Sequence, residues 1–143
     1  MNKNIRIDFY ESDGDQIIRI DVDHAIDLVR IADLMRSLAA IEVTGIDLIN
    51  ELDAYAPGTD YISMEVFDGP EHSFKTVYQV KSRGPRPKFR WIRSTEGWLQ
   101  CSEKVDIMVY STRPCHQYLA GGPVDDAVIV IAFRESYTPP IVR

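Results

Sequence analysis

The sequence predicts an α+β fold in which two consecutive helices pack on one face of a mostly antiparallel sheet of about six or seven strands. Three observations favour this class. Apolar and polar residues alternate in pairs of runs typical of two β-hairpins. Two segments with helical periodicity follow each other between these pairs, and two further strand-like runs lie near the C-terminus.

The first expected element is a hairpin. Residues 4–10 carry apolar side chains at every second position, and residues 18–22 repeat this period, which is that of a strand with one buried face. Asp13 and Gly14 lie between the two runs. An Asp-Gly pair in this position is a strong hairpin signal, because glycine accepts a positive φ at low cost and aspartate tolerates it.

Helical periodicity begins near Asp23. Apolar residues from there to about Ala40 recur at spacings of three and four, which predicts an amphipathic helix. A second helix is expected after Thr44, because Thr44 and Asp47 have the spacing of a weak capping box. The residues expected to face inward from this helix are Ile46, Ile49, Leu52 and Tyr55, and the helix is expected to end before Pro57 and Gly58.

The middle of the chain predicts a second hairpin. Residues 61–67 and 74–81 are rich in β-forming side chains, and residues 68–72 have the composition of a loop between them. Pro85 and Pro87 are expected to end this ladder, since proline donates no backbone hydrogen bond. Residues 89–92 are expected to form a further short strand.

Two C-terminal strands complete the expected sheet. Val105, Ile107 and Val109 alternate with polar residues, which indicates a strand. Residues 127–133 are continuously apolar, which is typical of a central strand covered on both faces. Helices on one side leave the second face of that strand to be covered, so we expect a homodimer or a partner protein.

The length of 143 residues predicts a single domain, 1–143, with an extended and mobile tail from about residue 136. The longest apolar run, 127–133, is much shorter than the roughly 20 residues of a membrane-spanning helix. Residues 1–10 lack the apolar stretch of a secretion signal. We therefore expect a cytoplasmic protein that does not bind membranes.

Charge is unevenly distributed along the chain. Residues 1–71 contain 16 acidic and 5 basic residues, a net charge of −11. Residues 72–95 contain 7 basic residues and no acidic one, a net charge of +7. Such asymmetry influences the choice of a charged partner and the rate of encounter with it, unless the two signs face each other within the molecule.

No cluster of residues has the spacing of a catalytic, metal or nucleotide motif, so we expect no metal and no cofactor. Cys101 and Cys115 flank the strand expected at 105–110, which would hold them too far apart for a disulfide. His116 follows Cys115, but neighbouring side chains of an extended backbone point to opposite sides. This arrangement disfavours a nucleophile and base pair.

The densest group of hard metal ligands surrounds the start of the first expected helix. It consists of Asp21, Asp23, His24 and Asp27. One histidine with scattered carboxylates matches no zinc or calcium spacing. Acidic residues also gather at helix starts because they cap free amides and complement the helix dipole, and we favour this interpretation.

The basic segment 81–93 permits two interpretations. Its basic side chains can neutralise phosphates while its aromatic rings stack on bases, as a single-stranded nucleic acid requires. Alternatively the rings face the core and the basic residues are the solvated back of a strand, which we favour because the whole chain is acidic, with a net charge of −6. The residues of the nucleic-acid interpretation are Lys81, Arg83, Arg86, Lys88, Phe89, Arg90, Trp91 and Arg93.

We therefore expect a non-enzymatic interaction or regulatory module that binds another protein through a charged surface. The partner fits best if it has a basic groove, because carboxylates can occupy the positions of phosphates in such a groove. The alternative is a single-stranded nucleic-acid-binding protein, and a third is a small enzyme whose carboxylates and histidines assemble only in the fold. The expected protein-binding residues of the acidic half are Asp27, Asp33, Asp47, Glu51 and Asp53.

Overall fold

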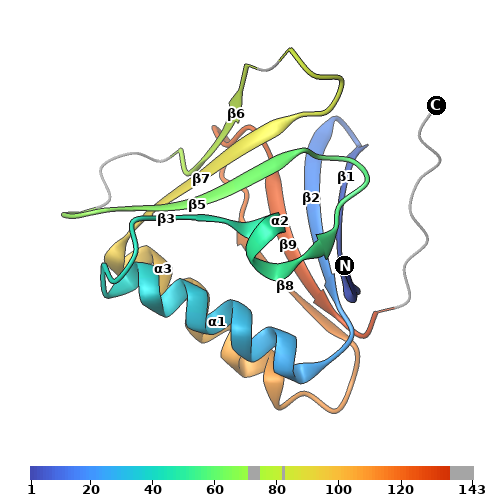
Figure 1. The fold of residues 1–143 in the computed structure, drawn as a ribbon, viewed down its shortest axis with the longest axis vertical. Coiled ribbons are helices and arrows are strands. Elements are labelled where there is room, and N and C mark those ends of the chain that lie inside the picture. Colours follow the sequence, from blue (N-terminus) through green and yellow to red (C-terminus); the bar gives the residue numbers. More distant parts are fainter. Residues whose placement is uncertain (71–74, 82, 136–143) are drawn as a thin grey trace.

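A computed structural model of the protein describes residues 1–70, 75–81 and 83–135. These residues form three helices and nine strands, and the strands make two mixed sheets (Figure 1). The α+β class is thereby confirmed. The predicted tail from residue 136 and part of the predicted loop 68–72 lie outside the described residues, as does Phe74 of the predicted second hairpin.

Sheet A is built on the predicted N-terminal hairpin. β1 (Asn2–Ser12) and β2 (Asp15–Val22) pair antiparallel along their length. Asp13 and Gly14 form the turn with positive φ values of 52° and 85°, which is the backbone geometry that an Asp-Gly pair accepts.

Three more strands complete sheet A, whose order is β4-β1-β2-β9-β8. β9 (Val128–Phe133) lies between β2 and β8 (Cys115–Ala120), so the continuous apolar run is an interior strand, as predicted. β9 runs parallel to β2, and β4 (Ala54–Tyr55) runs parallel to β1. Sheet A is therefore mixed, and the prediction of a mostly antiparallel sheet holds only in part.

Sheet B has the order β3-β5-β7-β6. Its strands are β3 (Gly45–Asp47), β5 (Tyr61–Phe67), β7 (Lys88–Ser94) and β6 (Val77–Val80). The predicted hairpin between 61–67 and 74–81 is wrong, because β5 and β6 both pair with β7, β5 in parallel and β6 antiparallel. The segment with the two prolines is the loop that joins β6 to β7.

The outer edge of β6 is covered by two neighbouring carboxylates. Asp125 accepts a hydrogen bond from the backbone N–H of Val77 over 2.9 Å, and Asp126 accepts one from Gln79 over 2.8 Å. The backbone N–H of Asp126 in turn donates to the carbonyl of Val77 over 3.0 Å. These bonds occupy groups through which an exposed strand edge can pair with another chain.

Two long helices pack side by side against the sheets (Figure 1). α1 (Ala25–Ala39) confirms the first predicted helix. α3 (Thr95–Val109) occupies the place of the predicted strand at 105–109, which is wrong. The residues that α3 buries recur at helical spacing, and the side chain of Ser94 caps the helix by accepting from the N–H of Gly97 over 3.0 Å.

The second predicted helix begins later than expected and is short. Residues 45–47 form β3, and α2 (Leu48–Leu52) begins after Asp47, whose side chain caps it by accepting from the N–H of Asn50. The chain leaves α2 through Asp53, which has a positive φ of 50°. The long helices are therefore not consecutive in the chain, although they are neighbours in space.

The hydrophobic core joins all of these elements into one cluster. The ring of Phe9 on β1 lies 5.5 Å from that of Phe89 on β7, so the two sheets contact each other directly. Trp91 and Trp98 stack edge to face at 4.7 Å between β7 and α3. Each layer contributes fully buried side chains, among them Ile7 and Ile20 of sheet A, Met64 of sheet B, Met35 of α1 and Val105 of α3.

Candidate functional site

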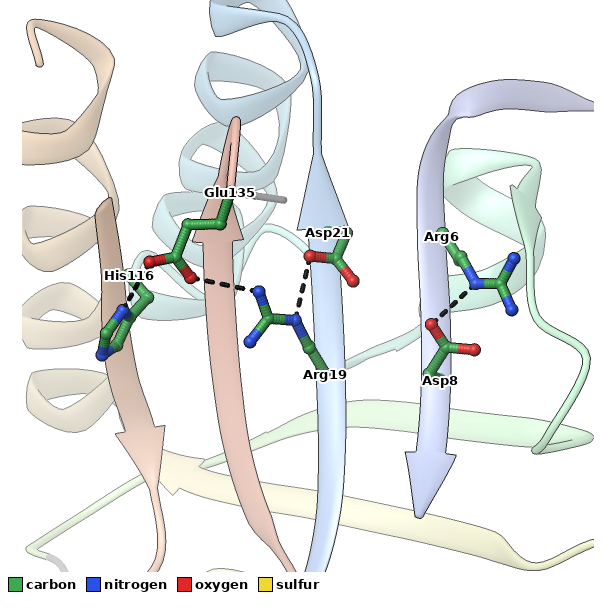
Figure 2. Close-up of polar contacts among 6 residues, drawn as sticks. All are labelled: Arg6, Asp8, Arg19, Asp21, His116 and Glu135. Atoms are coloured by element: carbon green, nitrogen blue, oxygen red, sulfur yellow. Dashed lines mark hydrogen bonds and ion pairs between the residues drawn. The ribbon is translucent and has the colours of Figure 1, made fainter. Parts of the chain in front are cut away.

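Charged side chains cross the face of sheet A that points away from α1, and we call them the charged ladder (Figure 2). They come from β1, β2, β8 and the segment that follows β9. The ladder consists of Arg6, Asp8, Arg19, Asp21, His116 and Glu135.

Strand periodicity places four of these charges. Arg6 and Asp8 are two positions apart on β1, so they share a face, and Arg6 Nε donates to Asp8 Oδ2 over 2.7 Å. Arg19 and Asp21 repeat this arrangement on β2 over 3.0 Å. In the hairpin register Arg6 faces Asp21 and Asp8 faces Arg19, so each charge faces one of opposite sign on the neighbouring strand.

Glu135 connects the hairpin charges to the edge strand β8. Its Oε1 accepts a hydrogen bond from Arg19 Nη2 over 3.1 Å, and its Oε2 lies 2.9 Å from His116 Nδ1. Ala132 of β9 lies between Asp21 and His116 in the sheet register. Because the side chain of Ala132 is small, the carboxylate of Glu135 can extend over β9 to reach both partners (Figure 2).

The ladder is most shielded from water at its centre. The side chains of Asp8, Arg19 and Asp21 are 7%, 13% and 17% exposed, whereas that of His116 is 46% exposed. Burial raises the pKa of Asp21 above its ordinary value, and this effect outweighs the hydrogen bond and charge of Arg19. One oxygen of that carboxylate, Oδ2, is buried without a hydrogen-bond donor.

For Glu135, the hydrogen bonds and charges of its partners outweigh the effect of burial on the pKa. Burial by itself acts to raise the pKa of Glu135, but the hydrogen bonds and charges of His116 and Arg19 are stronger together and hold this pKa below its ordinary value. The carboxylate is therefore ionised and fixed between two donors.

Exposed aromatic side chains form a rim around the ladder. The guanidinium of Arg6 lies 5.1 Å from the centre of the Tyr55 ring, which is a cation–π contact. On the opposite edge, the rings of His116 and Tyr118 meet edge to face at 5.6 Å, and Tyr118 is 60% exposed. We call the ladder and this rim together the ladder face.

Two of the predicted acidic binding residues have structural roles. Asp27 is buried near the start of α1, where the side chain of Asn2 lies within 3.4 Å of its Oδ1. Asp47 caps α2 through the N–H of Asn50. Both carboxylates therefore already have hydrogen-bond partners within the chain.

The remaining predicted acidic residues lie on the surface. Asp33 pairs with Arg36, which also binds Asp106 of α3. Asp53 pairs with the N-terminal ammonium over 2.9 Å, while Glu51 is exposed. None of these residues lies on the ladder face.

The aromatic residues of the basic segment are not available for stacking on bases. Phe89 and Trp91 are both fully buried and belong to the hydrophobic core. The interpretation that these rings face the core is therefore confirmed. A nucleic-acid surface on this segment would have to rely on its basic side chains alone.

Several of those basic side chains already have partners. Arg90 binds Glu65 through two hydrogen bonds of 2.8 and 2.7 Å. Arg86 lies 3.8 Å from Asp60, and Arg93 donates to the sulfur of Cys101 over 3.4 Å. Lys81 and Arg83 are exposed in the β6–β7 loop, and Lys88 is half-buried at the start of β7.

The two cysteines lie on different elements, and the group of Asp21, Asp23, His24 and Asp27 lies where β2 leads into α1. Cys101 is buried in α3 and Cys115 begins β8, and neither of them forms a disulfide. The structure places His24 at the start of α1 without a capping hydrogen bond from its side chain, and Asp27 in the first turn. Across residues 1–70, 75–81 and 83–135, no group of three or more His, Cys, Asp or Glu side chains is arranged to hold a metal ion.

Sequence reasoning did not identify the ladder, although a signal for part of it was present. Opposite charges at positions 6, 8, 19 and 21 fall on the polar side of the predicted hairpin, where they must face one another in any in-register pairing. His116 and Glu135 carry no such signal, because their contacts depend on the order of strands in sheet A.

None of the helices in the described part of the chain has the length and apolar character that crossing a membrane requires. Comparison of the chain with protein-family models, curated proteins and solved structures finds no match.

Proposed function

We propose that this chain is a protein-binding module and that the ladder face of sheet A contacts the partner. The observation that carries this proposal is the charged ladder itself, in which ion pairs of fixed geometry lie beside the exposed rings of Tyr55 and Tyr118. Tyrosine and arginine are enriched among residues that dominate binding energy at protein interfaces. Side chains that are already oriented lose less freedom on binding.

The unpartnered oxygen of Asp21 indicates the chemistry of the partner. A buried acceptor without a donor is unfavourable, and a donor brought by a partner would remove that cost. The acceptor is a carboxylate oxygen, and such an oxygen forms its strongest hydrogen bonds with charged donors, so a cationic group of the partner suits it best. This supports a partner with a basic surface, as expected from the acidic total charge.

The proposed surface differs from the acidic half expected from the sequence. Asp27 is buried and Asp47 caps a helix, so both carboxylates already have hydrogen-bond partners within the chain. Exposed charges such as Glu51 remain suited to long-range attraction, which affects the rate of association more than the contact itself.

Site-specific photo-cross-linking tests the proposal. A photoreactive phenylalanine analogue replaces Tyr118 on the ladder face or, as a matched control, Leu99, which is 46% exposed on α3. In an extract of the source cells, we expect a discrete protein adduct from position 118 that disappears in the Arg6→Ala, His116→Ala double variant. Adducts of equal yield from both positions, or none from position 118, would overturn the proposal.

The nucleic-acid alternative has the exposed basic loop between β6 and β7 as its support. Co-purification of nucleic acid that is released by salt and lost in a Lys81→Glu, Arg83→Glu variant would favour it over protein binding. The absorbance of the purified protein at nucleic-acid wavelengths, before and after a salt wash, measures this.

A further inference from the structure

A cleft with walls of opposite charge lies at the turn end of the N-terminal hairpin. Its volume is about 730 Å³, and it is lined by β1 and β2 on one side and by β6 and the β6–β7 loop on the other. Figure 1 shows the β1–β2 turn beside the β6–β7 loop at the top of the molecule. The residues that line the cleft include none of the charged ladder.

The two walls differ in charge. Glu11 lines the hairpin wall, and the exposed Asp13 and Asp15 follow it at the turn. Lys81 and Arg86 line the opposite wall. Within the part of the chain that the structure describes, no ion pair joins the two walls, although Arg86 also lies 3.8 Å from Asp60, which is not among the residues that line the cleft.

Between the charged walls the lining is apolar and held in place. Phe9, Val80, Pro85 and Pro87 contribute carbon surface, and Phe9 is backed by the ring of Phe89. The carbonyl of Pro87 accepts hydrogen bonds from the Thr59 hydroxyl over 2.8 Å and from the N–H of Asp60 over 3.2 Å. These bonds fix the end of the β6–β7 loop, and proline residues restrict its backbone further.

Two amide side chains add hydrogen-bonding groups to the cleft. Gln16 and Gln79 both line it, and the Oε1 atom of Gln16 is buried without a hydrogen-bond donor. A buried acceptor that lacks a partner carries an energetic cost. The Gln16 oxygen therefore has acceptor capacity that no donor in the described part of the chain uses.

We propose that this cleft binds a small zwitterionic ligand with an apolar body, of about the size of a dipeptide. The ammonium group of the ligand lies toward Glu11, its carboxylate lies toward Lys81 and Arg86, and its apolar part covers Phe9 and the prolines. The volume is within the range of about 300–1,000 Å³ that is usual for small-molecule sites. This site is separate from the proposed protein-binding surface.

Titration with a dipeptide of defined end charges tests this proposal. The probe is leucyl-phenylalanine, observed through the nitrogen-15 NMR signals of the full chain. We expect shifts of the Gln16 and Gln79 side-chain amides and of the Gly84 and Arg86 backbone amides. Acetylating the amino end or amidating the carboxyl end should each weaken binding about threefold, the effect typical of one exposed charge pair.

Variants assign each charge to one end of the ligand. Glu11→Gln should weaken binding of the free dipeptide about threefold and leave the acetylated form unchanged, whereas Lys81→Gln should affect the free but not the amidated form. Lys3→Gln and Glu103→Gln, at exposed positions outside the cleft, are the matched controls. Equal affinity for the free and the doubly blocked dipeptide would overturn the proposal, and so would the absence of shifts at the cleft.

Discussion

Arg19 Nη2 donates a hydrogen bond to Glu135 Oε1 over 3.1 Å, although these residues are 116 positions apart in the chain. The contact requires β9 to run parallel to β2, so that the end of β9 delivers Glu135 to the end of β2. The same carboxylate holds the ring of His116 on the next strand. One side chain thus ties three strands of sheet A together on its charged face.

Replacing Glu135 by glutamine should destabilise the fold by about 1 kcal/mol at about pH 7, because a charged acceptor is replaced by a neutral one. The folded-state pKa of Glu135 is below its ordinary value, so its contribution is present above that ordinary value and is lost as pH falls through the lowered pKa. Urea unfolding of both proteins at about pH 7 and about pH 3 measures this. A difference in stability that is equally large at both values would contradict the prediction.

Replacing Asp21 by asparagine should change the stability of the fold in the opposite direction. The pKa of Asp21 is raised in the folded state, so folding favours the protonated carboxyl and loses stability as pH rises through the folded-state pKa. Asparagine resembles the protonated form. We expect Asp21→Asn to raise the free energy of unfolding at about pH 7 and to have little effect at about pH 3, whereas Asp23→Asn, at an exposed position, should have little effect at either value.

Urea unfolding midpoints of the Asp21→Asn variant, the Asp23→Asn variant and the unaltered protein measure this effect. A loss of stability at about pH 7 would show that the ion pair with Arg19 outweighs burial of the carboxylate.

Replacing Asp125 by alanine should cost about 2–4 kcal/mol, since hydrogen bonds to a charged acceptor are the strong ones. Its carboxylate accepts from the N–H groups of Val77 and Gly122 over 2.9 Å each. Loss of these bonds also exposes the edge of β6, so light scattering should detect association. Asp68→Ala, at an exposed position, is the control, and equal midpoints for the two variants would refute the expectation.

Tryptophan fluorescence should not respond to single-stranded oligonucleotides. Trp91 and Trp98 are both fully buried, and the indole N–H of Trp98 donates to the carbonyl of Glu65 over 2.8 Å. Base stacking on Trp91 would require β7 to leave the core. Quenching that saturates with oligonucleotide and weakens with salt would show that the basic segment binds nucleic acid through its rings after all.

Local patterns were sufficient for the elements whose partners are close in the chain. The Asp13–Gly14 turn and the alternation on each side of it predict β1 and β2, because a two-residue turn fixes the register of its own hairpin. The periodicity of α1 was equally clear. Glu65 and Arg90 illustrate the limit, since their bidentate pair depends on β5 and β7 running parallel, which no turn between them specifies.

The C-terminal helix shows how a local pattern can mislead. Val105, Ile107 and Val109 alternate by type, yet Val105 is fully buried and Ile107 is 68% exposed, because both belong to α3. The true period appears only when the start of the helix is included, since Trp98 shares a buried face with Cys101, one turn away, and with Val105, two turns away. Three alternating residues therefore carried too little information to separate a strand from a helix.

By itself the sequence determined the α+β class, the first hairpin, the first long helix and the interior position of β9, because short-range periodicity and turn chemistry specify these features. Only the tertiary structure decided which strands are neighbours. That order of strands in turn forms the charged ladder and the cleft with walls of opposite charge. Both sites join side chains from distant segments. These segments become neighbours because the fold buries their apolar faces together, and the charges and spacings along the chain do not specify which segments will pair.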